Sequence, residues 1–142
     1  LSKLIEKSIL PFESLLYERK IKFNYEIEDK INFKCNQDEI KQLMAILLDN
    51  AIKHSEKNGE VKVVLKKEKQ IILSISNKGK EIEKEDLEHI FERFYRADKS
   101  RNRDENRYGL GLAIAKRIVD NHNGKISCTS ENGLTNFKVI FK

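Results

Sequence analysis

The chain has 142 residues, of which 39% are hydrophobic and 36% are charged, so it suits one globular domain and is neither disordered nor fibrous. Its longest apolar run, residues 43–48, is far shorter than the roughly 20 residues that a membrane helix needs. The 28 basic and 23 acidic residues leave a net charge of +5 and alternate along the chain, so we expect no nucleic-acid partner, which would require basic residues gathered on one face.

The N-terminal segment predicts a helix followed by a strand. Apolar residues recur at helical spacing over residues 2–19, with Pro11 as the expected position of a kink. Residues 21–27 alternate between apolar and polar, which is the period of a half-buried strand. A short extended piece is expected at residues 31–35.

The middle of the chain predicts a long helix, a pair of strands and a second helix. Asp38 is the expected N-cap of the long helix, which runs to about residue 54. Alternation over residues 61–65 and 71–75 predicts two strands joined by a charged turn, and residues 84–95 predict a helix.

The C-terminal part predicts one more helix and a closing hairpin. Residues 109–122 form the helix, and residues 125–130 and 136–141 form the strands. The predicted fold class is therefore α+β, a two-layer sandwich with one sheet covered on one face by three helices.

Residues 97–108 do not fit a compact core. Only the two end residues of this segment, Ala97 and Tyr108, are apolar, and seven of its residues carry a formal charge. Loops of this length without regular structure are commonly functional, so we interpret the segment as a lid.

One face of the long helix carries Asn50, Lys53 and His54, at spacings of three and four residues. An amide beside a cation and an imidazole suits a phosphate-rich ligand that carries Mg²⁺. The same pattern is also compatible with an ordinary amphipathic helix.

Two further motifs point to nucleotide chemistry, each with a plainer alternative. Asn77 and Gly79 follow a predicted strand, where a polar side chain can bind a planar base or the pair can simply form a turn. Gly109 and Gly111 open a helix, where backbone N–H groups can approach phosphate or the glycines can serve close packing.

In their order along the chain, these motifs resemble the catalytic and ATP-binding domain of bacterial sensor histidine kinases. The segment DNAIKHS (residues 49–55) resembles the N box of that family, and NKG (residues 77–79) lies where the first G box belongs. IFERFYR (residues 90–96) resembles the F box, and GLGLAIAK (residues 109–116) resembles the second G box. The resemblance implies a mixed five-stranded sheet with three helices, the Bergerat fold, over a single domain of residues 1–142.

The resemblance also implies roles for individual residues. Asn50 would hold Mg²⁺, and Lys53 and His54 would contact the phosphates of ATP. Asn77 would meet the adenine amino group, with Gly79 leaving room for the base and Thr135 supporting the pocket. The remaining ATP-binding residues that it implies are Ile82, Phe94, Arg96, Gly109, Leu110, Gly111 and Leu112.

The sequence departs from the family pattern at several of these positions. Ile46 replaces a second asparagine, and Asn77 replaces the aspartate that reads adenine. Glu81 replaces a glycine, and it would repel phosphate unless it points outward or pairs with Lys80 or Lys84. These changes motivate an alternative function: a degenerate, non-catalytic interaction module with weak or no ATP binding.

None of the histidines stands in the H-E-x-x-x-P pattern of the family's phosphoacceptor. The resemblance therefore implies a catalytic fragment without a certain catalytic residue of its own, acting on a histidine domain of the same or a partner subunit. The phosphoryl group would then pass to a response regulator. We expect the fragment to be monomeric, and the full protein to be a membrane-anchored homodimer with this domain in the cytoplasm.

Overall fold

The computed structural model describes residues 1–93, 95 and 110–142. The predicted lid, together with Phe94, Arg96 and Gly109, lies outside the described residues. The helices are α1 (Ser2–Ile9), the 3-10 turn η1 (Leu10–Phe12), α2 (Glu13–Glu18), α3 (Gln37–His54), α4 (Lys84–Leu87) and α5 (Leu110–Asn121). The strands are β1 (Lys22–Ile27), β2 (Glu60–Lys67), β3 (Ile71–Lys78), β4 (Lys125–Glu131) and β5 (Leu134–Phe141).

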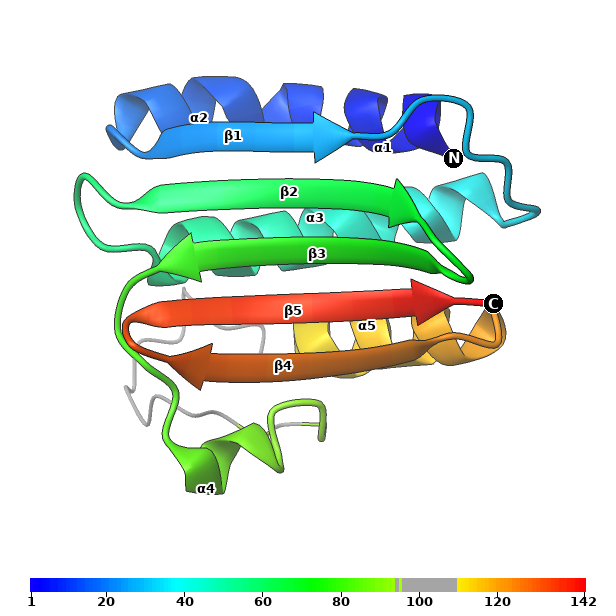
Figure 1. The fold of residues 1–142 in the computed structure, drawn as a ribbon. Helices are drawn as coiled ribbons and strands as arrows, with labels where there is room; N and C mark the ends of the chain where they lie inside the picture. Colours follow the sequence, from blue (N-terminus) through cyan, green and yellow to red (C-terminus); the bar gives the residue numbers. More distant parts are fainter. Residues whose placement is uncertain (94, 96–109) are drawn as a thin grey trace.

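The five strands form one mixed sheet in the order β1-β2-β3-β5-β4. The β1–β2 pair is parallel and the other three pairs are antiparallel. In Figure 1, α1, α2, α3 and α5 all lie behind the sheet, while short α4 lies beyond the β4 edge. The predicted two-layer α+β sandwich is confirmed.

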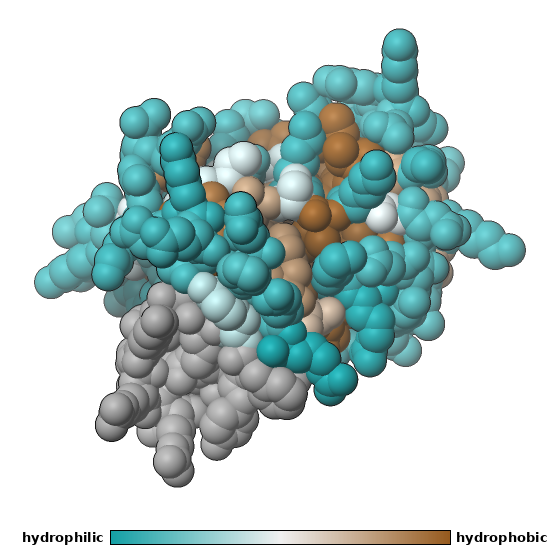
Figure 2. Space-filling model, turned by 90° about the horizontal axis from the view of Figure 1, so that it is seen from below, coloured by the Kyte–Doolittle hydropathy of each residue, from teal (hydrophilic) through white to brown (hydrophobic). Residues whose placement is uncertain are grey.

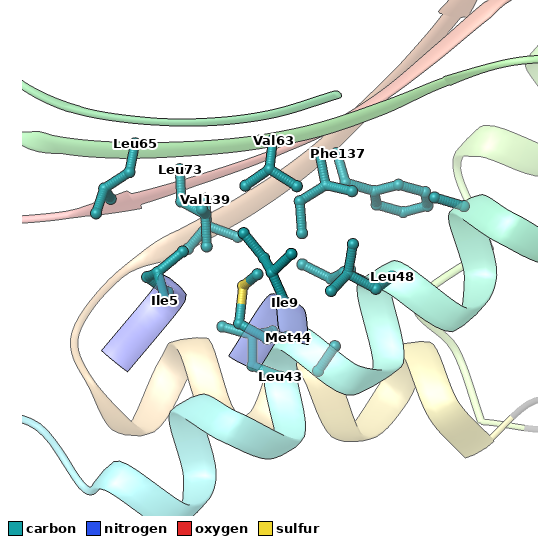
Figure 3. Close-up of a cluster of buried hydrophobic side chains, with 14 of the residues drawn as sticks. Ile5, Ile9, Leu43, Met44, Leu48, Val63, Leu65, Leu73, Phe137 and Val139 are labelled. Carbon is teal, nitrogen blue, oxygen red and sulfur yellow. The ribbon is translucent and has the colours of Figure 1, made fainter. Parts of the chain in front are cut away.

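The core lies between the sheet and the helix layer. Alternate residues of β2, β3 and β5 point inward, among them Val63, Leu73 and Val139, each at most 1% exposed. Figure 3 shows these side chains meeting Leu43, Met44 and Leu48 of α3 and Ile5 and Ile9 of α1. Burying an aliphatic side chain of this size contributes about 1.5–3 kcal/mol, so this interface holds the two layers together.

The sheet ends at β4, whose outer edge no described strand covers. Its inward residues Ile126 and Cys128 are only half-buried, although they lie opposite the buried Val139 and Phe137 of β5.

Figure 2 views the molecule from this side and shows a mainly hydrophilic surface crossed by a band of apolar residues. In the part of the chain that the structure describes, no helix combines the length and the apolar character needed to cross a bilayer.

The cap of α3 differs from the prediction. Asn36, in an extended conformation, is the N-cap, and its side-chain oxygen accepts a hydrogen bond from the Glu39 N–H at 3.1 Å. Asp38 lies instead in the first turn of the helix. Its negative charge interacts favourably with the helix dipole there, but its side chain does not cap the helix. The helix therefore starts two residues earlier than the sequence pattern suggested.

One other predicted element is shorter than expected. The helix expected over residues 84–95 ends at Leu87, and residues 88–93 form turns closed by bonds such as Glu92 N–H to His89 C=O. These turns bury Ile90. A regular helix in this place could bury side chains on only one of its faces. Residues 31–35, expected only as a short extended piece, have no regular secondary structure, and the Ile31 N–H donates to Ser2 Oγ.

His122 connects two helices through both of its ring nitrogens. Its Nε2 accepts a hydrogen bond from the Asn36 N–H at 3.1 Å, and its Nδ1 lies 2.8 Å from the Ile118 carbonyl oxygen. A backbone N–H can only donate, so Nε2 carries no proton and Nδ1–H donates to Ile118. This ring joins the end of α5 to the cap of α3.

Candidate functional site

The last turns of α3 carry the predicted phosphate and metal ligands. Leu47, Leu48 and Ala51 of this helix are buried, which fixes its rotation and leaves Asn50 and Lys53 half-buried beside the core stripe. Within the described residues, the Asn50 carboxamide forms no hydrogen bond and the Lys53 ammonium forms no ion pair. Both side chains therefore present unused polar groups at the same end of α3.

A tight joint brings this end of α3 against the end of β3. Ser55 and Gly79 form a bridge between the two segments, and the Glu56 N–H donates to the Lys78 carbonyl at 3.0 Å. A Cβ atom on Gly79 would lie only 2.1 Å from the His54 carbonyl oxygen. Gly79 is therefore needed for this backbone contact, whatever room it also leaves for a ligand.

Asn77 occupies the inward series of β3, after Ile71, Leu73 and Ile75, and is 1% exposed. Its Nδ2 atom is buried without a hydrogen-bond partner in the described part of the chain. Leaving a buried donor unpaired costs about 1–3 kcal/mol, so Nδ2 is available to a hydrogen-bond acceptor from outside the described residues. No other side-chain nitrogen or oxygen of the described residues is buried without a hydrogen-bond partner.

The sheet register places Thr135 of β5 directly opposite Asn77. Thr135 is 4% exposed, and its hydroxyl lies 2.8 Å from the hydroxyl of Ser130 on β4. Ser130 Oγ in turn accepts a hydrogen bond from the Ile82 N–H at 2.8 Å. This chain of hydroxyls fixes the segment after β3 close to Asn77, and so assembles three of the predicted residues.

Sequence reasoning did not identify Ser130. The signal was present, because Ile126, Cys128 and Ser130 alternate toward the inner face of β4 and the hairpin turn sets Ser130 opposite Thr135. A hydroxyl at an inward position next to another predicted site residue can be found once the register of the hairpin is known.

Glu81 is held by a backbone contact in the β4–β5 hairpin turn. Its Oε1 accepts a hydrogen bond from the Gly133 N–H at 2.8 Å, and the Gly79 N–H donates to the Gly133 carbonyl at 2.9 Å. Asn132 and Gly133 both have positive φ, as a tight two-residue hairpin turn requires. Glu81 forms an ion pair with neither Lys80 nor Lys84; the hairpin turn holds its carboxylate instead.

The start of α5 lies against α3. Gly111 is its second residue, and a Cβ atom there would meet Ile46 Cγ2 at 3.7 Å, an ordinary contact. Ile46 thus packs toward the glycine segment in the place where a second asparagine was expected. Leu112 is half-buried against the core, and for Leu110 the structure describes only the backbone.

A cavity of about 420 Å³ lies at the end of the sheet beside the β4–β5 turn. Of the predicted site residues it includes only Gly79, and it is lined by Glu56, Lys78, Gly79, Glu131, Asn132, Gly133 and Leu134. It is therefore distinct from the place where Asn77 and Thr135 point.

Comparison with known proteins decides the family. A model described as "Histidine kinase-, DNA gyrase B-, and HSP90-like ATPase" matches residues 35–142. The chain belongs to this ATPase family. The resemblance to the histidine-kinase members is confirmed by relatives named as sensor proteins and histidine kinases.

Two curated relatives illustrate the similarity. Sensor protein DltS of Streptococcus agalactiae serotype III is 42% identical over 132 residues, which cover 92% of this chain and 33% of DltS. Signal transduction histidine-protein kinase ArlS of Staphylococcus aureus strain USA300 is 44% identical over 113 residues, which cover 78% of this chain and 25% of ArlS. The chain thus spans a third or less of the length of these relatives.

Solved structures show the same fold. The nucleotide-free catalytic domain of histidine kinase ThkA has a TM-score of 0.86 and 27% identity, covering 99% of this chain and 91% of that domain. ThkA in complex with the response regulator protein TrrA has a TM-score of 0.83 and 26% identity, covering 99% of this chain and 40% of that one.

The F-box segment of this ATPase domain contains a small polar cluster. The Tyr95 hydroxyl donates a hydrogen bond to Asp86, which raises the pKa of Tyr95 to about 12. His89 Nδ1 lies 2.8 Å from Glu92 Oε2, and this hydrogen bond raises the pKa of His89. Phe91 packs edge-on against Phe137 of β5, with ring centroids 6.1 Å apart. These contacts anchor the segment to α4 and to the sheet.

Proposed function

We propose that residues 1–142 form the catalytic and ATP-binding domain of a sensor histidine kinase. It binds Mg-ATP and donates the γ-phosphoryl group to a histidine on a separate domain, for relay to a response regulator. The observation that carries this proposal is the unpartnered, buried amide of Asn77, next to the Thr135–Ser130–Ile82 chain in a fold shared with histidine-kinase ATPases.

Within this proposal, the base of ATP lies against Asn77 and Thr135, with Ile82 held at its side. The phosphates extend toward the end of α3, where Lys53 supplies positive charge and the imidazole of His54 lies in the same turn. Leu110, Gly111 and Leu112 at the start of α5 approach them from the facing helix, where the positive end of the helix dipole favours anions. Phe94, Arg96 and Gly109 complete the proposed set from the segment outside the described residues.

The donor chemistry of the described residues fits a magnesium ion that arrives with the triphosphate. No three of the His, Cys, Asp and Glu side chains described come together as a metal site. Asn50 offers one half-buried amide oxygen, which is sufficient for Mg²⁺ because this ion usually takes few protein ligands and keeps phosphate oxygens and waters. When bound, Mg²⁺ would neutralise the charge that develops on the transferring phosphoryl group.

The chain's own residues then act by positioning and electrostatics. Asn77 and Thr135 orient the base, and Lys53 offsets phosphate charge. Asp49 is exposed and lies about 100° around the helix from Asn50, so it does not face the same group. The proton acceptor for the attacking histidine therefore comes from the separate phosphoacceptor domain.

The names of the relatives and of one solved structure support proposals for the partners and the location. Proteins similar to this chain are named sensor proteins, and ThkA has been solved with its response regulator. We propose that the parent protein is a membrane-anchored homodimer that carries this domain in the cytoplasm, and that the domain alone is monomeric.

The alternative, a degenerate interaction module, is not favoured. It was motivated by Ile46, Asn77 and Glu81, but Glu81 is held at Gly133 and Ile46 makes an ordinary contact near Gly111. Asn77 keeps an amide oxygen that can still accept a hydrogen bond from an amino group. The names of the relatives also agree with a kinase.

Calorimetric titration of the domain with ATP, with and without Mg²⁺, tests the proposal. We expect binding that Mg²⁺ strengthens, and we expect Asn50→Ala to remove most of that Mg²⁺-dependent gain while leaving Mg²⁺-free binding nearly unchanged. Asn24→Ala, on the exposed face of β1, is the matched control and should bind as the parent does. No heat at millimolar ATP would refute nucleotide binding, and an equal loss with and without Mg²⁺ would refute the role of Asn50.

A further inference from the structure

Asn77 differs in hydrogen-bonding capacity from the aspartate that the family pattern places there. A carboxylate only accepts hydrogen bonds, whereas a carboxamide carries an acceptor and a two-proton donor side by side. In this structure the donor end, Nδ2, is buried and unpartnered among the described residues. A ligand that fills the site therefore has to satisfy a donor as well as an acceptor.

We propose that Asn77 makes this site tolerant of 6-oxopurine nucleoside triphosphates, which it accepts alongside ATP. The inference rests on the proposed nucleotide site and specifies its substrate class. Adenine presents an amino donor at position 6 and an acceptor at N1. A 6-oxopurine presents the reverse, an acceptor at O6 and a donor at N1. A carboxamide pairs with either edge after a 180° turn about its terminal bond, whereas a carboxylate opposes O6 with a second acceptor.

The structure leaves the Asn77 amide free to turn. Its backbone is fixed in the sheet opposite Val61 and Thr135, but no hydrogen bond to its side chain selects one orientation in the described residues. A side chain that read only adenine would need a neighbour to hold its oxygen toward the amino group.

The neighbouring hydroxyls impose no direction either. Ser130 Oγ accepts the Ile82 N–H, and in the 2.8 Å contact between Ser130 and Thr135 either oxygen can be the donor. Thr135 can therefore offer a proton or a lone pair toward the base beside Asn77. The Asn77 carboxamide and the Thr135 hydroxyl can therefore both change between donating and accepting a hydrogen bond, and they can change together.

Inosine triphosphate is the sharpest probe, because its base differs from adenine only on the edge at positions 6 and 1. The domain is titrated with ATP and with ITP in the same Mg²⁺ buffer. We expect the Kd for ITP to lie within about tenfold of the Kd for ATP. A ratio above tenfold in the parent overturns the proposal while leaving ATP binding, and so the proposed function, intact. Absence of ATP binding would instead refute the proposed function, and this inference with it.

Asn77→Asp provides the second test. It should raise the ITP-to-ATP ratio of Kd values about tenfold or more, mainly by weakening ITP, because the carboxylate then faces O6 without a shared proton. Asn136→Asp adds the same charge next to Thr135 but on the opposite face of the sheet, and should leave the ratio unchanged. An unchanged ratio in Asn77→Asp, or an equal change in both variants, contradicts the proposal. If Asn77→Asp does not fold, the ratio in the parent decides alone.

Discussion

At the scale of single residues, Gly79 and Gly111 of the predicted G boxes serve different purposes. An added methyl group on Gly79 would meet the His54 carbonyl oxygen at 2.1 Å, and neither backbone can yield without opening the joint between α3 and β3. On Gly111 the same group would meet Ile46 Cγ2 at 3.7 Å. Packing therefore accounts for the glycine at 79, and it does not account for the glycine at 111.

We expect Gly79→Ala to lower the free energy of unfolding by about 1–3 kcal/mol, the usual cost of forcing extra volume into a packed contact. Gly111→Ala should leave it unchanged or raise it by up to about 1 kcal/mol, because alanine favours helix. Urea unfolding of both variants, followed by circular dichroism, measures the difference. Equal stability of the two variants would show that the α3–β3 joint adapts and that Gly79 is kept for another reason.

Individual residues were predictable where a local motif carries them. Asn50, Asn77 and Gly79 were proposed from their boxes, which are contiguous in sequence, and their roles in ligand binding stay predictions. Ser130 and the hydrogen bond to His122 were not predicted, because each depends on a partner far along the chain: Ile82 for one and Asn36 for the other. Such pairings follow from the sheet register and from helix packing, which single-residue patterns do not encode.

At the scale of elements, the N-terminus of α3 decides how the helix is held. Asn36 caps it, accepts a bond from Glu39, and also gives its own N–H to His122 of the α5 end. Asn121 adds a further contact from its Nδ2 to Glu39 at 3.2 Å. The cap is thus shared between two helices, and α3 carries Asn50 and Lys53 at its opposite end.

Asn36→Ala should lower the free energy of unfolding by about 1 kcal/mol, the typical cost of losing an N-cap side chain. Asp38→Ala, at the position that the sequence suggested as the cap, should cost only a few tenths to about 1 kcal/mol, through the helix dipole alone. Chemical denaturation of the two variants side by side distinguishes them. A larger loss in Asp38→Ala would mean that the helix is capped at Asp38 in solution.

Helices and strands were predicted well where their apolar residues repeat at one regular spacing. The strands and α3, with their alternating or helical patterns, are found within a few residues of the expected bounds. The segment after Leu87 misled the prediction because Ile90 and Phe91, adjacent in sequence, both turn toward the protein, which a helix does not favour. Pro11 acted as expected, since η1 interrupts the N-terminal helix at that point.

At the scale of the whole molecule, the core extends beyond the part that the family model covers. The model begins at residue 35, yet Ile5, Ile9 and Leu16 are each at most 2% exposed and belong to the same buried cluster as α3 and the sheet. Ser2 reinforces this attachment, because its hydroxyl donates to the Glu28 carbonyl and accepts the Ile31 N–H. The N-terminal helices are therefore part of the folding unit that positions α3.

The Ile5→Ala variant measures how strongly the N-terminal helices are coupled to the rest of the folding unit. Removing a fully buried isoleucine from the contact of α1 with β2 and α3 should cost about 2–5 kcal/mol, and the loss should appear in a single cooperative transition. Lys3→Ala, on the exposed side of the same helix, should stay within about 0.5 kcal/mol of the parent. Urea unfolding is followed by far-ultraviolet circular dichroism and by tyrosine fluorescence. Coincident curves shifted together in Ile5→Ala show one cooperative unit, because α1 and the sheet then share the same free energy of unfolding. If α1 were a separate appendage, the sheet transition would keep its midpoint and only the helical signal would be lost early.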